Sequence, residues 1–381
     1  MNILYTLDSG NFGGMEKHVL DLVEGMVAKG HFVFVWCREG ELVDAYKSKG
    51  ARVFIKKLHF DIDPFYILEL IIFLKKHKIQ VVHSHELKAA SNALLAASIA
   101  GVRARITHVH TPISEWEESV PVKRLIRPFV IFWYSFLVNL LSFSEIALTE
   151  SRKTVKIKEG IRPKKLRVIH NGIDLRKYED LQSRSGEYRQ EILQRYKVPS
   201  SAFILGNVSR MSQEKGHSIL INAFAKLVKS GDISDNFYLL LAGGGVLENE
   251  LRDLTKNLGI ADKVIITGVF NEEDHVKFYA TIDLFVFPTL AEGFGYVLVE
   301  AMSSRHPVVC SDLEVLKEVA GNTVKYFKTG DMDDLYIKIV ETYKLFKSQN
   351  YVLDEAYNRV KNEYSLEKFV DKYEMLYREA Q

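Results

Sequence analysis

The stretch Pro288-Thr-Leu-Ala-Glu-Gly-Phe-Gly-Tyr-Val-Leu-Val-Glu-Ala-Met302 follows an apolar, strand-like run, Leu284–Phe287. Residues Tyr296 to Ser303 have the apolar spacing of a helix, so the stretch predicts a strand-to-helix connection, the repeating unit of α/β folds. Two carboxylates, Glu292 and Glu300, lie on either side of this connection. In a regular helix, a rise of about 1.5 Å per residue separates them by roughly 12 Å.

Gly293, Phe294 and Gly295 turn the chain at the predicted start of the helix. The free N–H groups and the positive dipole end of a helix N-terminus suit a diphosphate. A carboxylate on each side could accept hydrogen bonds from sugar hydroxyls. The layout therefore predicts a site for a diphosphate with a hydroxyl-rich group at each end, which describes a nucleotide-sugar. An ordinary helix cap is the alternative.

A second segment supplies positive charge. Gly206-Asn-Val-Ser-Arg-Met-Ser-Gln-Glu-Lys-Gly216 lies between another predicted strand and a helix, and it contains Arg210 and Lys215. A planar guanidinium and a compact ammonium can together neutralise a leaving diphosphate. A solvated charged loop is the alternative.

These two segments carry a family resemblance. A glutamate, seven intervening residues and a second glutamate, with Gly-Phe-Gly after the first, resembles the donor motif of retaining glycosyltransferase family 4. The segment with Arg210 and Glu-Lys-Gly216 resembles the same family, and the likeness runs from an N-terminal Gly-Gly loop to the last helix. It implies the GT-B fold, with two Rossmann-like doubly wound domains facing a cleft and a C-terminal helix that returns to the first domain.

The resemblance also implies roles. Glu292 would hold hydroxyls of the transferred sugar and Glu300 the ribose, while Arg210 and Lys215 would stabilise the leaving diphosphate. Gly293, Phe294 and Gly295 would complete the donor site. Ser303-Ser304-Arg305 and Glu314-Val315 depart from the family pattern on the sugar side. The sequence therefore does not identify the sugar, the base or the acceptor.

Two further glycine turns follow predicted strands. Gly13 and Gly14 would let the backbone approach a phosphate or sugar closely. Glu16, in the helix that follows, is a candidate acceptor residue, although it and His18 could equally only cap or solvate that helix. Gly243 and Gly245 resemble the family's turn near the nucleotide base.

Histidines end two strands of the first half. His110, after His108, matches the family's strand-end histidine, and the match implies contact with the transferred sugar or its phosphate. His85, after His83, is a candidate for acceptor or donor contact. Glu86 adjoins His83 and His85, but three such residues without a fourth ligand do not form a metal motif. We therefore predict no metal and no cofactor besides the donor substrate.

Length and composition set the broad class. A chain of 381 residues predicts two domains, and 47% hydrophobic with 26% charged residues is typical of a soluble globular protein. Two distant cysteines in apolar runs, Cys37 and Cys310, indicate reduced thiols. The first residues form a predicted strand and not a signal peptide, so we expect a cytoplasmic protein.

Alternating strands and helices predict two parallel sheets. We expect the first domain to span 1–174 with the terminal helix 365–381, and the second to span 175–364. The polar run 180–189 is interpreted as a surface connection. The predicted strands are Ile3–Leu7, Phe32–Trp36, Val53–Ile55, Val81–His83, Ile106–Val109, Glu145–Leu148, Leu166–Ile169, Ile204–Val208, Phe237–Ala242, Val264–Thr267, Leu284–Phe287, Val308–Cys310 and Val324–Phe327.

The first half is also a candidate membrane-facing surface. Residues 1–180 carry a net charge of +7 and the remainder −5. Residues Pro128 to Ser144 are uncharged and follow Lys123, Arg124 and Arg127. A helix in 121–144 could lie in the membrane interface, or it could be buried in the first domain. A spanning helix is disfavoured because polar residues interrupt the run.

We therefore expect a metal-independent hexosyltransferase that uses a nucleotide-sugar donor and a glycan or lipid-linked acceptor, in cell-surface glycan or glycolipid synthesis. Peripheral membrane contact at the inner face is expected, and no nucleic-acid partner. Two alternatives stay open. One is a nucleotide-sugar 2-epimerase of the same architecture, and the other is a non-catalytic nucleotide-sugar-binding protein.

Overall fold

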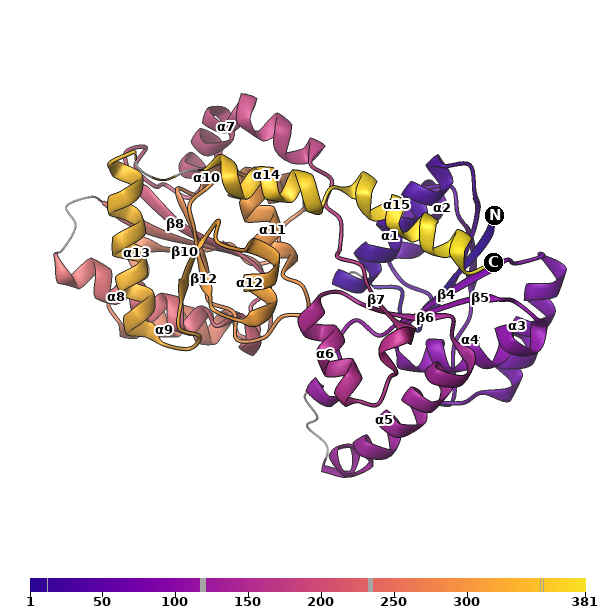
Figure 1. The fold of residues 1–381 in the computed structure, drawn as a ribbon. Coiled ribbons are helices and arrows are strands. Elements are labelled where there is room, and N and C mark those ends of the chain that lie inside the picture. Colours follow the sequence, from indigo (N-terminus) through magenta and orange to yellow (C-terminus); the bar gives the residue numbers. More distant parts are fainter. Residues whose placement is uncertain (12, 117–120, 232–235, 350, 352) are drawn as a thin grey trace. The chain divides into compact units, whose positions relative to one another are not determined.

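The computed structural model describes residues 1–11, 13–116, 121–231, 236–349, 351 and 353–381 (Figure 1). The chain divides into two compact units, each described by itself. Unit 1 comprises Met1–Gly172 and Leu366–Gln381, and unit 2 comprises Ile173–Ser365.

Unit 1 is a parallel sheet with strand order β3-β2-β1-β4-β5-β6-β7 among the described residues, with helices on both faces. Its strands are β1 (Asn2–Thr6), β2 (Phe32–Cys37), β3 (Arg52–Ile55), β4 (Val81–His85), β5 (Ala104–His108), β6 (Ser144–Ala147) and β7 (Leu166–Val168). Its helices are α1 (Gly14–Ala28), α2 (Leu42–Ser48), α3 (Pro64–Lys76), α4 (Leu87–Ala100), α5 (Pro121–Leu141), α6 (Glu150–Lys158) and α15 (Leu366–Glu379), with 3₁₀ turns η1 (Ile113–Glu115) and η2 (Pro163–Lys165).

Unit 2 repeats the plan with strand order β10-β9-β8-β11-β12-β13, again parallel over the described residues. Its strands are β8 (Phe203–Val208), β9 (Phe237–Ala242), β10 (Val264–Ile266), β11 (Leu284–Phe287), β12 (Val308–Ser311) and β13 (Lys325–Phe327). Its helices are α7 (Arg176–Arg195), α8 (His217–Ser230), α9 (Glu248–Asn257), α10 (Glu272–Thr281), α11 (Tyr296–Ser303), α12 (Glu314–Ala320), α13 (Met332–Lys347) and α14 (Asp354–Glu363), with η3 (Gln213–Lys215) and η4 (Ala261–Lys263).

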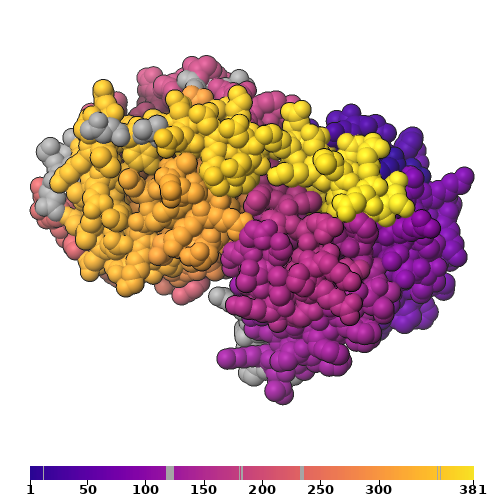
Figure 2. Space-filling view, in the orientation of Figure 1, coloured from indigo at the N-terminus to yellow at the C-terminus, as the bar shows by residue number. Residues whose placement is uncertain are grey.

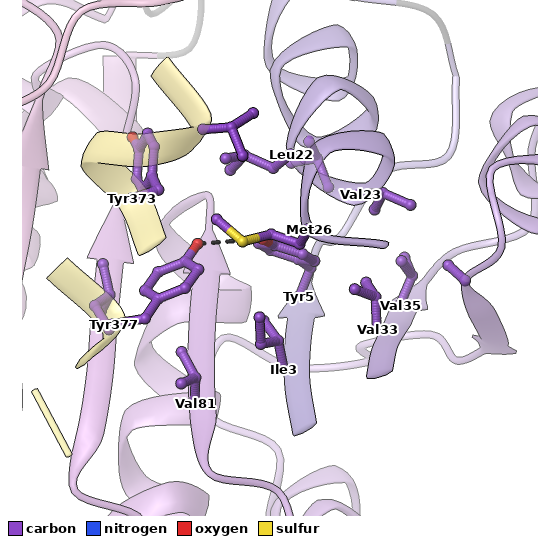
Figure 3. Close-up of a cluster of buried hydrophobic side chains, with 14 of the residues drawn as sticks. Ile3, Tyr5, Leu22, Val23, Met26, Val33, Val35, Val81, Tyr373 and Tyr377 are labelled. Atoms are coloured by element: carbon purple, nitrogen blue, oxygen red, sulfur yellow. Dashed lines mark hydrogen bonds between the residues drawn. The ribbon is translucent and has the colours of Figure 1, made fainter. Parts of the chain in front are cut away.

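The last helix completes the core of unit 1, as predicted. Its apolar residues Phe369, Val370 and Tyr373 recur at helical spacing and pack in one buried cluster with β1 and α1. Figure 3 shows Tyr373 and Tyr377 of this helix beside Tyr5 of β1 and Leu22 of α1. The Tyr377 hydroxyl lies 3.2 Å from the Tyr5 hydroxyl and 2.7 Å from Nδ1 of His83. Residues from both ends of the sequence therefore share one core.

The predicted strands are all confirmed to within two residues, but one interpretation of a connection is wrong. Residues 180–189 are not a surface connection, because they lie inside helix α7. Tyr178, Leu181 and Ile192 are buried on one side of this helix, which packs on α10. The polar residues between them cover the solvent side, and the apolar stripe is too sparse to stand out in the sequence.

Candidate active site

The segments with the two acids and the two cations lie at the point where the strand order of the second sheet reverses. Strands β8 and β11 are neighbours there, although two strands separate them in sequence. The loop that carries Arg210 and Lys215 follows β8, and the loop that carries Glu292 follows β11. In open α/β sheets, ligands bind outside the carboxyl ends of strands at such a reversal.

Lys215 and Glu292 form an ion pair across these two loops. The Lys215 Nζ lies 2.5 Å from Oε1 of Glu292, and the two side chains are only 16% and 11% exposed. The hydroxyl of Thr289 lies 3.3 Å from the same carboxylate oxygen and 2.9 Å from the carbonyl oxygen of Glu214, to either of which it can donate its proton. The amide of Leu290 donates to that carbonyl at 2.7 Å. Hydrogen bonds from a side chain and from the backbone thus hold the two loops, and with them the ion pair, in place.

Glycines let the loops approach this closely. A Cβ at Gly216, where φ is +65°, would lie 2.1 Å from the Pro288 carbonyl oxygen. A Cβ at Gly243 would lie 2.1 Å from the carbonyl oxygen of Ser209, and one at Gly245 2.4 Å from that of Met211. The predicted glycine turn after β9 therefore packs directly on the loop that carries Arg210.

Glu300 lies on α11 in a mostly buried setting, beside aromatic and basic partners. The Tyr279 hydroxyl donates to Oε2 of Glu300 at 3.0 Å, and Nε2 of His275 lies 3.4 Å from the same oxygen. Burial lowers the pKa of His275, but the Glu300 carboxylate outweighs this, so the net pKa is raised. Glu300 is thus an acid held in a fixed position.

The other predicted donor residues differ in how exposed they are and in which groups they offer to a ligand. The Arg210 side chain is 74% exposed and lies 3.2 Å from Glu214. Gly295 caps α11 with φ +91°, and Gly293 precedes it in the same turn. The Phe294 ring is buried against Tyr364, so its side chain packs inside unit 2 and leaves only backbone groups for a ligand.

In unit 1 the strand-end histidines gather into one cluster. His85 Nδ1 lies 3.2 Å from His110 Nε2, and the His108 and His110 rings stack with centroids 3.7 Å apart. His18 from α1 joins them, and its Nδ1 lies 2.6 Å from Oδ1 of Asn171. Burial lowers the pKa of His18 to about 4. Burial, with smaller contributions from the neighbouring histidines, holds the pKa values of His85, His108 and His110 well below 6.5. The imidazoles are therefore neutral at pH 7.

Four of these histidines could in principle hold a metal ion. One nitrogen from each of His18, His85, His108 and His110 lies within 4.8 Å of the others. The structure thus supplies the fourth ligand that the sequence pattern lacked. However, the His85 to His110 contact already joins two ring nitrogens, and a shared ion would have to displace it.

Comparisons with known proteins agree with this geometry. The family model described as Glycosyltransferase Family 4 matches residues 12–177, and that described as Glycosyl transferases group 1 matches residues 188–359. The chain is a family 4-like glycosyltransferase. The two matched segments together cover most of the chain.

Individual relatives span nearly the whole glycosyltransferase. The Putative glycosyltransferase EpsF of Bacillus subtilis (strain 168) is 26% identical over 84% of this chain and 81% of its own length. The Escherichia coli UDP-Gal:alpha-D-GlcNAc-diphosphoundecaprenol alpha-1,3-galactosyltransferase is 25% identical over 90% of this chain and 87% of its own length. The crystal structure of Anabaena Alr3699/HepE in complex with UDP and glucose has the same fold, with a TM-score of 0.81 at 20% identity over 98% of each chain.

From the sequence, His18 could have a role in the site or could equally only cap or solvate its helix, and this second interpretation is wrong. It is fully buried in the histidine cluster of the glycosyltransferase. Glu16 is nearly buried, and its Oε2 occupies the space that a Cβ at Gly13 would need. Gly14 begins α1. The absence of a side chain at Gly13 therefore leaves space for the Glu16 carboxylate.

A buried ion pair that was not predicted from the sequence lies behind the histidines. The Lys156 ammonium contacts the Glu145 carboxylate and donates to the Val109 carbonyl at 2.7 Å, while the Tyr134 hydroxyl donates to Glu145 at 2.9 Å. This network fixes the backbone between His108 and His110. A charged residue inside the apolar strand run around Glu145 was the available signal.

Glu86, between the end of β4 and α4, is a second residue that sequence reasoning undervalued. Its φ is +65°, an uncommon value for a residue other than glycine, and it accepts a 2.7 Å hydrogen bond from the amide of Asp8. Burial raises its pKa to about 7. Strain and a raised pKa beside His85 mark Glu86 as a candidate functional residue.

Proposed function

We propose that this glycosyltransferase moves a hexose from a nucleoside-diphosphate sugar to an acceptor hydroxyl with retention of anomeric configuration. The observation that carries the proposal is the Lys215–Glu292 pair at the reversal of the second sheet, with Glu300 on the helix that follows. The likeness to a fold solved with UDP and glucose, and to a relative named for a UDP-Gal donor, supports it.

Each residue has a defined part in the proposal. Lys215 and Arg210 stabilise the charge that develops on the leaving diphosphate, where transition-state stabilisation is most effective. Glu292 holds hydroxyls of the transferred sugar and keeps Lys215 in place through their ion pair. Glu300 holds the ribose. A phosphate oxygen of the donor accepts the proton of the acceptor hydroxyl as the new bond forms on the same face.

We further propose that the reaction needs no bound metal. Two cationic side chains and the N–H groups at the start of α11 supply the positive charge that a metal would otherwise give the diphosphate. On unit 1, His110 keeps the role that the family resemblance implies, contact with the transferring sugar, and His85 and Glu16 are acceptor-side candidates.

The acceptor is proposed to be a glycan or lipid-linked glycan of the cell surface, as the name of the Escherichia coli relative suggests. Helix α5 supports contact with the inner face of a membrane. Within the described residues, Arg124–Leu141 is the one stretch long and apolar enough to cross a membrane, and only 22% of it is buried. Leu125, Phe132 and Phe136 are exposed along one side, with Arg124 near the start of the helix, as in an interfacial helix. The Lys123 side chain lies outside the described residues.

Two experiments test these proposals. A thermal-shift screen against UDP-, GDP-, ADP- and TDP-sugars should raise the melting temperature with one nucleotide class, because a ligand that binds only the native state stabilises it. No shift with any of them would contradict a nucleotide-sugar donor. Separately, wild-type protein should pellet with phosphatidylglycerol vesicles more than a Leu125→Ser/Phe132→Ser/Phe136→Ser variant, and equal pelleting would remove the membrane contact.

A further inference from the structure

Unit 1 contains a cavity of about 600 Å³. It is bounded by residues 61–62, the first turns of α4, the η1 segment and one side of α5. Most of its wall is apolar and includes Ile62, Leu87, Ile113, Ile126 and Trp133. This volume is within the ordinary range for sites that bury a small apolar ligand.

The cavity lies beside the exposed apolar surface of α5. Helix α5 presents one side to the interior of unit 1 and another to solvent, where Leu125 is 81%, Phe129 69% and Phe132 65% exposed. Phe129 also lines the cavity, so the solvent-facing stripe and the cavity wall are continuous. The outer atoms of α5 lie on the lower surface of unit 1 in Figure 2. On another part of the wall, Ile62 is 37% exposed.

The polar groups of the wall carry a net positive charge. Lys88 pairs with Asp61 at 2.8 Å. Arg127 donates to the carbonyl oxygens of Ser114 at 3.2 Å and Trp116 at 2.6 Å, and it has no carboxylate partner among the described residues. A guanidinium that contacts only carbonyls keeps its full charge for an anionic ligand such as a phosphate or diphosphate.

Residues of the cavity wall lie close in sequence to residues of the histidine cluster. Leu87 and Lys88 follow His85 by two and three residues, and Ile113 follows His110 by three. A molecule whose tail fills the cavity would therefore have its polar end near the strand ends that carry the acceptor-side candidates.

We infer that this cavity binds the hydrocarbon chain of a lipid-linked acceptor, with the acceptor's phosphate group beside Arg127 and Lys88. The inference rests on the proposed function, because it assigns the acceptor class of that reaction. The apolar stripe of α5 in the membrane interface would give the chain a path from the bilayer into the cavity without crossing water.

The probe is farnesyl diphosphate, compared with inorganic diphosphate, in vesicle-free buffer containing saturating UDP to cover the donor site. We expect farnesyl diphosphate to bind at least tenfold more tightly, since each buried methylene strengthens binding about fourfold. Ile126→Trp, which fills the cavity from its rim, should weaken this binding at least tenfold. Val130→Trp, which fills it from the same helix, is a second variant in case the first does not fold.

The matched control is Ile99→Trp, at the far end of α4 on an exposed site outside the cavity. It should bind farnesyl diphosphate like the wild type. Equal binding of the two diphosphates, or equal binding by the cavity-filling and control variants, would overturn the inference. A concentration-dependent dimer that Ile126→Trp abolishes would also overturn it, because a second copy would then occupy the surface. Nucleotide-sugar thermal shifts in the same variants report separately on the proposed function.

Discussion

Nζ of Lys215 lies 2.5 Å from Oε1 of Glu292, although 77 residues separate them in the chain. One residue comes from the loop after β8 and the other from the loop after β11. A mostly buried pair of this kind costs desolvation energy and contributes little net stability. Its presence is better explained by a ligand that uses both charges, an anion at Lys215 and hydroxyl groups at Glu292.

Glu300 controls the charge of His275. In Glu300→Gln we expect the pKa of His275 to fall below 6.5, because burial then acts without the opposing carboxylate. In the wild type the raised pKa contributes stability below pH 6.5, and this contribution is lost as the pH rises through the folded value. NMR titration of His275 measures the shift. The exposed neighbour Glu272 is the control, and a Glu272→Gln effect as large as that of Glu300→Gln would contradict the assignment.

Gly216 tests how the two loops are held together. Gly216→Ala should destabilise unit 2 by at least about 2 kcal/mol more than Gly259→Ala and abolish donor binding. Both glycines have positive φ, +65° and +70°, but only a Cβ at Gly216 meets backbone, the Pro288 carbonyl, whereas nothing lies within 4 Å of one at Gly259. Urea unfolding gives the comparison, and equal losses would show that φ alone sets the cost.

Glu86 should make stability depend on pH. Its pKa is raised to about 7, so the folded protein holds this proton more tightly than the unfolded chain. Stability should therefore fall as the pH rises from about 4.5 to about 7, by about 1–3 kcal/mol. Glu86→Gln should remove this slope, whereas Glu41→Gln, at an exposed position on the same unit, should keep it. Unfolding curves at pH 5 and pH 8 decide, and an unchanged slope in Glu86→Gln would refute the prediction.

The histidine cluster allows a test of metal independence. Purified protein should contain well below one equivalent of transition metal per chain, and dialysis against EDTA should leave transfer activity unchanged. Elemental analysis of wild type and His18→Ala provides the measurement. One equivalent of zinc that disappears in His18→Ala would show that the four histidines hold an ion.

A structural feature can be predicted from the sequence alone when the residues that form it are close together in the chain. The strand Leu284–Phe287 and the glycine turn before α11 are local patterns, so their positions were predictable. The partner of His18 is Asn171, 153 residues away, and only the folded sheet brings them within 2.6 Å. The Lys215–Glu292 contact is of the same kind. Each residue could be chosen from its motif, but the pairing required the strand order.

The most direct test of the central claim is transfer of a radiolabelled sugar from the donor that gives the largest thermal shift. The assay supplies a mixture of lipid-linked and soluble acceptors. We expect wild-type protein to release nucleoside diphosphate and to transfer the labelled sugar to an acceptor in this mixture. Lys215→Ala and Glu292→Gln should lose roughly 100-fold or more of this activity. Lys226→Ala, which removes a surface ion pair to Asp333, should retain it. Wild-type turnover by Lys215→Ala or Glu292→Gln would contradict the account.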